Sequence, residues 1–181
     1  MLSTRSCKIN SFIKIFLIFI TNLVLCFLIK TAYIPPDIID IAEGAASKTV
    51  DEALIVSVIK CESGFNKNAV SDKGACGLMQ LKRETFYYVC DLYGLNENDI
   101  FSAYSNVSAG ACYLEYLINK FGTLNEALCA YNAGEGTVLR WLDDRDYSAN
   151  GKTLDRIPYK ETRDYLAKVK YYYCLYKGFL L

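Results

Sequence analysis

Residues 61–81 read CESGFNKNAVSDKGACGLMQL, and this stretch decides how the chain folds and where its chemistry lies. It places one carboxyl group, Glu62, at the end of an apolar segment. A polar loop rich in glycine follows, with Gly64, Gly74 and Gly77. The stretch therefore predicts a helix that ends near Glu62, with a compact loop beside its last turn.

The apolar residues before Glu62 recur at helical spacing. Ile55, Val58 and Ile59 are three and four residues apart, so Glu62 is the next position on the same inward-facing stripe. A carboxyl group there loses water, which favours its neutral form and raises its pKa. A protonated glutamate in a cleft is what cleavage of a glycosidic bond requires of its general acid. Taken alone, however, a glutamate at a helix end more often has a structural or solvated role.

Three further blocks complete a larger pattern. They are 106–114, with Asn106-Val107, Gly110, Tyr113 and Leu114; 127–134, which read ALCAYNAG; and 157–169, with Ile157-Pro158, ETRDY at 161–165 and Lys168-Val169. With residues 62–81, these blocks resemble, in order, the soluble lytic transglycosylase family, lysozyme-like enzymes that cleave bacterial peptidoglycan. The resemblance covers about residues 37–176. It implies an all-α fold with a lysozyme-like transglycosylase domain.

The resemblance also implies the roles of five residues. Glu62 would protonate the oxygen between N-acetylmuramic acid and N-acetylglucosamine, then accept a proton from the muramic acid 6-hydroxyl as that group attacks C1. The product would be a 1,6-anhydromuramoyl end. Ser71 and Gln80 would hold N-acetyl groups or the reacting sugar, and Tyr131 and Glu161 would face the cleft. No metal ligand or other cofactor is implied.

The sequence leaves several alternatives open. Ser71 and Gln80 could instead stabilise a turn and the start of a helix. Tyr165 could pack the last helix onto the domain. Asp72 is a nearby carboxylate that is more simply interpreted as a solvated loop charge. A muramidase that uses water, or a peptidoglycan-binding assembly module without turnover, would carry much of the same sequence.

The amino terminus predicts a membrane segment. Phe12 to Ile29 is apolar apart from Lys14, Thr21 and Asn22, and Arg5 and Lys8 precede it. Eighteen residues at about 1.5 Å each nearly match the hydrocarbon thickness of a bilayer. We expect residues 1–30 to be an uncleaved signal anchor, with a cleaved signal as the alternative, and residues 31–181 to be an extracytoplasmic catalytic domain in a single-pass membrane protein.

Charge limits the partners of the catalytic part. Four of the 20 basic residues and none of the 20 acidic residues lie in positions 1–30, so the remainder carries 16 against 20. Nucleic-acid binding is therefore not expected, because it needs clustered positive charge. Peptidoglycan glycan strands are the expected partner, and secretion or other cell-envelope machinery stays an open one.

Eight cysteines raise the question of disulfides and metals. The chain has no histidine, and its cysteines lack the paired spacing of zinc modules, so we expect no metal site. A catalytic thiol lacks a histidine partner. Burial as small apolar side chains is the leading interpretation, with one or more disulfides as the alternative.

Helices are expected almost throughout. The first begins at Pro35-Pro36 and ends near Ser47, and the second begins at a capping box at 49–52 and ends near Glu62. The third follows an apolar stripe from Val107 to Phe121 and is closed by Gly122. The fourth begins at a second capping box at 123–126 and leads to Tyr131, and the last extends from about Tyr159 to Lys177. Residues 143–153 are expected to form a surface loop.

One residue departs from the family pattern, and two aromatic runs need a separate interpretation. The chain has Lys82 where the family usually has a methionine that lines the cleft, so this ammonium group faces either the substrate or solvent. The runs 86–88 (FYY) and 171–173 (YYY) are candidates for sugar stacking. At most one ring of each run can face a cleft, because consecutive helical residues point in different directions.

Overall fold

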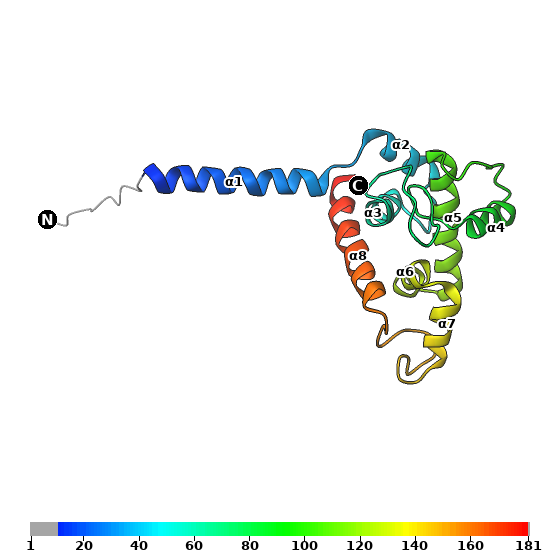
Figure 1. The fold of residues 1–181 in the computed structure, drawn as a ribbon. Helices are drawn as coiled ribbons and strands as arrows, with labels where there is room; N and C mark the ends of the chain where they lie inside the picture. Colours follow the sequence, from blue (N-terminus) through cyan, green and yellow to red (C-terminus); the bar gives the residue numbers. More distant parts are fainter. Residues whose placement is uncertain (1–10, 181) are drawn as a thin grey trace. The chain divides into compact units, whose positions relative to one another are not determined.

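The computed structural model describes residues 11–180, and eight helices form in this range (Figure 1). Arg5, Cys7 and Lys8, which entered the expectation of an anchor or of disulfides, lie outside the described residues. The chain divides into two compact units between Tyr33 and Ile34.

The first unit contains helix α1, Ser11–Ala32, whose side chains from Ile13 to Ile20 are exposed. Two of its polar side chains bond to their own helix: Thr21 and Asn22 both donate to the carbonyl of Ile18, at 2.9 and 2.8 Å. Within the described residues, no helix has both the length and the hydropathy of a membrane span.

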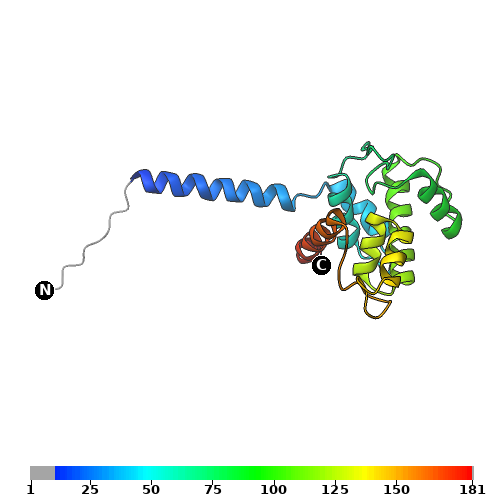
Figure 2. The ribbon, with the colours of Figure 1, turned by 60° about the horizontal axis from the view of Figure 1, so that its bottom comes forward.

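The second unit is all-helical, as the sequence predicts. Its helices are α2 (Pro36–Ala45), α3 (Glu52–Glu62), α4 (Arg83–Tyr93), α5 (Ala103–Phe121), α6 (Leu124–Ala133), α7 (Glu135–Asp143) and α8 (Lys160–Leu180). Among the residues described, extended pairing is limited to isolated bridges that join Cys76 to Val70 and to Leu81. Figure 2 shows the same helices from a second direction.

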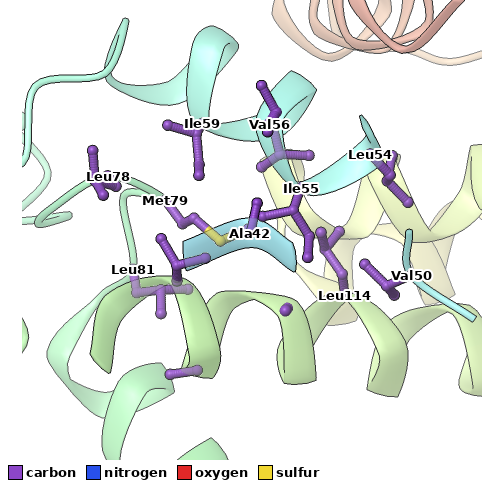
Figure 3. Packing of buried hydrophobic residues seen from close by; sticks show 14 of the residues in the cluster. Ala42, Val50, Leu54, Ile55, Val56, Ile59, Leu78, Met79, Leu81 and Leu114 are labelled. Carbon is purple, nitrogen blue, oxygen red and sulfur yellow. The ribbon is translucent and has the colours of Figure 1, made fainter. Parts of the chain in front are cut away.

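Helix α3 is the centre of the larger core. All residues from Ala53 to Ile59 are buried, and the helix packs against α8 and α2. Figure 3 shows Ile55 and Ile59 in one cluster with Leu78 and Met79 of the following loop. Burying an isoleucine side chain contributes about 1.5–3 kcal/mol. The apolar stripe inferred from Ile55, Val58 and Ile59 is confirmed, since all three are fully buried.

The start of α3 differs from the expected capping box. Asp51 rather than Thr49 is the N-cap, and its carboxylate accepts a 2.9 Å hydrogen bond from the backbone N–H of Leu54. Aspartate caps a helix as well as threonine does, and its negative charge also suits the positive end of the helix dipole. At α6 the predicted N-cap is confirmed, because Thr123 Oγ1 accepts from the backbone N–H of Glu126. The Glu126 carboxylate bonds instead to the Thr123 hydroxyl and to the backbone N–H of Leu154.

Helix α7 is an element that the sequence interpretation left out. Gly134 has φ of +89°, which ends α6 and lets α7 begin one residue later. Helix α7 then buries Val138, Trp141 and Leu142 in a second apolar cluster with α6. The loop expected over 143–153 begins at the last residue of α7 and continues to the start of α8.

Candidate active site

The loop after α3 is held by one buried amide. Asn106 on α5 accepts a 2.8 Å hydrogen bond from the backbone N–H of Met79, and its Nδ2 donates to the carbonyls of Cys76 and Ile100 at 3.1 and 2.9 Å. A buried amide with these bonds satisfied fixes backbone position, because breaking any of them leaves a polar group unpaired. Asn106 therefore sets the path of the loop.

Two glycines permit the loop to lie close to α5. A Cβ atom at Gly77 would lie 2.4 Å from Asn106 Nδ2, and φ of +80° also favours glycine there. A Cβ atom at Gly110 would lie 2.3 Å from Met79 Sδ. The side chain of Met79 is fully buried, so the loop is packed into the core at this point.

Glu62 is the last residue of α3, and most of its carboxyl group is enclosed while part of its surface opens to a cleft. Burial raises its pKa from 4.5 to about 7. A hydrogen-bond donor on Tyr165 and the positive charge of Lys168 oppose this rise, and the negative charge of Glu161 adds to it. A carboxyl with this pKa is protonated in a large fraction of molecules at neutral pH.

Two tyrosines lie around this carboxyl group. The hydroxyl of Tyr131 donates a 2.7 Å hydrogen bond to the carbonyl of Met79, which ties α6 to the loop. The hydroxyl of Tyr165 is buried, and no acceptor lies in ideal hydrogen-bond geometry to it. It faces the Glu62 carboxyl group, to which it acts as a donor. Burial, and then the Glu62 charge, raises the pKa of both phenols, so both are neutral.

The cleft has a volume of about 620 Å³ and lies between the loop, α4, α5, α6 and the start of α8. All five residues predicted from the sequence line it: Glu62, Ser71, Gln80, Tyr131 and Glu161. The structure therefore brings together residues up to 99 positions apart in the chain. Its other lining residues include Asp72, Lys73, Lys82, Thr85, Tyr113 and Asn132.

The two polar loop residues have structural bonds as well as a place in the cleft. Ser71 Oγ accepts a 3.0 Å hydrogen bond from the backbone N–H of Ala75, and Nε2 of Gln80 donates to the carbonyls of Ala69 and Gly77 at 3.1 and 2.9 Å. These bonds leave the hydroxyl hydrogen of Ser71 and the amide oxygen of Gln80 without a partner in the described structure. Gln80 has φ of +48°, which is uncommon for a residue with a side chain.

Charged residues stand at the mouth of the cleft. Glu161 forms a 3.8 Å ion pair with Lys73, with the two side chains 73% and 78% exposed. A pair this exposed contributes at most about 1 kcal/mol. Asp72 and Lys82 are also exposed cleft residues. Lys82 thus both lines the cleft and meets solvent.

Tyr165 is the residue whose place the sequence interpretation missed. Packing of the last helix is the interpretation that the sequence slightly favours, and Tyr165 does lie in the core, but its hydroxyl also reaches Glu62. Its position four residues after Glu161 was the available signal, because residues at that spacing share one helix face.

The cysteines expected to be buried differ in exposure. Cys76, Cys90 and Cys129 are buried, Cys61 and Cys112 are partly buried, and Cys174 is exposed. All six are free thiols. Within residues 11–180, no cluster of three or more candidate metal ligands occurs.

Comparison with known proteins gives a consistent result. The sequence matches the profile of the family described as Transglycosylase SLT domain over residues 40–153. The soluble lytic murein transglycosylase of Salmonella typhimurium is 28% identical over 139 residues, 74% of this chain and 22% of the relative. Membrane-bound lytic murein transglycosylase C of Histophilus somni is 34% identical over 154 residues, 71% of this chain and 42% of the relative.

A solved structure agrees with these sequence matches. The 70 kDa soluble lytic transglycosylase SLT70 of Escherichia coli superposes with a TM-score of 0.67 at 25% identity. The match covers 78% of this chain and 24% of SLT70. This chain therefore spans less than half the length of the relatives that it matches.

Proposed function

Because this chain belongs to the Transglycosylase SLT domain family, we propose that it is a membrane-anchored peptidoglycan lytic transglycosylase. It cleaves the β-1,4 bond between N-acetylmuramic acid and N-acetylglucosamine and leaves a 1,6-anhydromuramoyl end. The observation that carries the proposal is the state of Glu62, a carboxyl group in a cleft whose burial raises its pKa to about 7.

In the first step Glu62 donates its proton to the glycosidic oxygen. The C1–O bond of the muramic acid residue breaks, and the N-acetylglucosamine residue leaves with the proton and the bonding electron pair. An oxocarbenium-like centre remains at C1, next to a Glu62 carboxylate whose negative charge stabilises it.

In the second step the 6-hydroxyl of the same muramic acid residue attacks C1. Glu62 accepts the proton that the hydroxyl loses, which restores the acid for another cycle. An intramolecular attack needs only one catalytic group, whereas hydrolysis needs a second carboxylate placed for water or for covalent attack. Among the described carboxyl groups of the cleft, Asp72 and Glu161 are exposed to solvent and Glu62 alone is enclosed.

The four other predicted residues bind the sugar. The free hydroxyl hydrogen of Ser71 and the free amide oxygen of Gln80 offer one donor and one acceptor, which suit an N-acetyl group. Tyr131 holds the loop through Met79 and forms a wall beside Glu62. Glu161, which keeps only a weak contact with Lys73, accepts from sugar hydroxyls at the mouth.

Residues 1–30 anchor the enzyme, and residues 31–181 form its catalytic domain outside the cytoplasm. Two features support the anchor: the apolar sequence from Phe12 to Ile29 and the exposed apolar side chains of α1. In addition, Thr21 and Asn22 form hydrogen bonds within the helix, which satisfies polar groups that lipid could not. The positive charges before the segment place the amino terminus inside. Envelope machinery that crosses the cell wall is a further partner class in this proposal.

Mass spectrometry of purified peptidoglycan digested by the full chain tests the reaction. Fragments about 18 Da lighter than the hydrolysed muropeptides, from the water not added, are expected. Full-mass reducing ends would identify a hydrolase instead, and would direct attention to Asp72 as the second carboxylate. Binding without any fragments would identify a non-catalytic module.

Membrane fractionation tests the anchor. The full chain should remain with membranes in high salt and alkaline carbonate and should be released by detergent. Release by carbonate alone would contradict an integral anchor, and a shortened mature chain would identify a cleaved signal.

A further inference from the structure

Tyr131, which forms a wall beside Glu62, is the first ring of a row that continues through Tyr113, Tyr116 and Tyr88. The first two rings line the cleft, and the last two lie beyond it. Their centroids are 5.4 Å apart for Tyr131 and Tyr113, 6.2 Å for Tyr113 and Tyr116, and 6.2 Å for Tyr116 and Tyr88. We call this set the tyrosine row.

The tyrosine row leaves the cleft in a defined direction. Thr85 of α4 and Tyr113 of α5 both line the cleft. Tyr88 and Tyr116 each follow three residues later, on the same helix faces and about one turn further along. The row therefore continues from the cleft along the side where α4 meets α5, two helices that pack against each other (Figure 1).

The outer end of the row is available to a ligand. The Tyr88 residue is 51% exposed, and its ring meets that of Tyr116 edge-on. Polar groups lie beside the Tyr116 ring. Lys120 donates to the hydroxyl of Tyr116 at 3.2 Å and forms a 2.6 Å ion pair with Glu135. Exposed aromatic rings next to a few fixed polar groups are typical of a binding site rather than of a core.

A polymeric substrate requires such a surface. A cleft of about 620 Å³ is in the range that holds one small ligand, whereas a glycan strand continues in both directions from the bond that is cut. The strand must leave the cleft over neighbouring side chains. A pyranose ring presents an apolar C–H face that packs on an aromatic ring, while its hydroxyl and N-acetyl groups bond to polar groups at the edge.

We propose that Tyr88 and Tyr116 form an additional saccharide-binding subsite, which holds the peptidoglycan glycan strand one step outside the catalytic cleft. The inference rests on the proposed function for the identity of the ligand. The ligand of the subsite is a glycan, because the tyrosine row is continuous with the cleft in which the bond is cut. The subsite makes the enzyme prefer long strands over short oligosaccharides.

Tyr87 supplies a matched control on the adjacent position. It is 45% exposed, nearly as much as Tyr88, but its ring packs on Phe86 at 5.3 Å and is not part of the row. Replacing either tyrosine removes a similar exposed side chain from the same helix. Only Tyr88→Ala removes a ring from the row.

Binding is measured with the full chain in mild detergent, in a Glu62→Gln background that stops turnover. The ligands are long glycan strands from purified peptidoglycan and a tetrasaccharide of the same repeat. Tyr88→Ala is expected to weaken long-strand binding about fivefold, a factor within the range of one aromatic contact, and to leave tetrasaccharide binding unchanged. Tyr88→Phe, which keeps the ring, and Tyr87→Ala should both bind like the parent.

Equal long-strand affinity for the Tyr88→Ala protein and its parent would overturn the proposed subsite. So would an equal loss for both ligands, since that result would place the effect in the cleft or in the fold. The readout is binding, so it is separate from the chemistry. A wild-type enzyme that yields no anhydro ends would defeat the proposed function whether or not Tyr88 matters for affinity.

Discussion

Replacing Glu62 by glutamine should stabilise the fold while it abolishes cleavage. The amide is nearly isosteric with the carboxyl group and cannot donate the proton that the reaction needs. It also cannot ionise, so it avoids the unfavourable burial of a charge. The expected gain in stability depends on pH, and its size follows from the raised pKa of Glu62.

The sign of the effect is set by the two pKa values. In the folded protein burial raises the pKa of Glu62 to about 7, whereas the ordinary value of 4.5 applies to the unfolded chain. Below pH 4.5 both states carry the proton, and the carboxyl group leaves stability unchanged. Between pH 4.5 and 7 the unfolded state loses its proton first, so the wild-type protein becomes less stable as the pH rises. Above pH 7 both states are ionised and the loss is complete.

The magnitude is obtained from the same values. One pKa unit corresponds to about 1.36 kcal/mol, so a rise from 4.5 to about 7 corresponds to about 3 kcal/mol at most. Glu62→Gln lacks this loss. Its free energy of unfolding, relative to wild type, should therefore rise by up to about 3 kcal/mol between pH 4 and pH 8.

Urea unfolding at pH 4 and pH 8 measures this difference. Glu43→Gln, which replaces an exposed carboxyl group on α2, controls for the loss of one negative charge. A Glu62→Gln protein with the same stability difference from wild type at both pH values would refute the reasoning. That result would mean that the carboxyl group is not desolvated in the folded state.

Three further outcomes follow from the contacts around the cleft. Tyr165→Phe removes a donor that lowers the pKa of Glu62, so this pKa should rise. The loss of activity at alkaline pH, where Glu62 gives up its proton, should then occur at higher pH. An unchanged activity–pH profile would assign Tyr165 to packing alone. Glu161→Gln removes a negative charge that raises the pKa of Glu62, so the same loss of activity should move to lower pH, and a shift in the other direction would contradict the electrostatic account. Gly110→Ala should destabilise the fold by about 1–3 kcal/mol in thermal or urea unfolding, because its Cβ would overlap Met79. The control Gly44→Ala, on α2 with open space around it, should stabilise the fold by about 0.5–1 kcal/mol. Equal effects of the two substitutions would show that the loop does not pack as described.

Helical periodicity predicted the part of the site that depends on local sequence. The spacing of Ile55, Val58 and Ile59 predicted a buried α3 and a desolvated Glu62 at its end, and burial is the largest cause of the raised pKa. Such a prediction succeeds because the stripe and the carboxyl group belong to one helix, whose geometry fixes their relation.

The remaining parts depend on contacts between distant segments. Asn106 lies 27 residues from Met79, and a hydroxyl on Tyr165 reaches Glu62 from another helix. Periodicity carries no information about which loop an asparagine will hold or which side of α8 will face the cleft. The choice of Asp51 over Thr49 as N-cap is a smaller case, since either side chain satisfies the local rule.

Gln80 shows why a structural and a functional interpretation of one residue need not compete. Its amide nitrogen holds the carbonyls of Ala69 and Gly77, which stabilises the loop on which it lies. The same bonds fix the side chain where it lines the cleft. A backbone φ of +48° is kept at this residue because the surrounding bonds over-determine it. The loop is therefore ordered before any sugar arrives, and binding a glycan does not have to supply the free energy of ordering it.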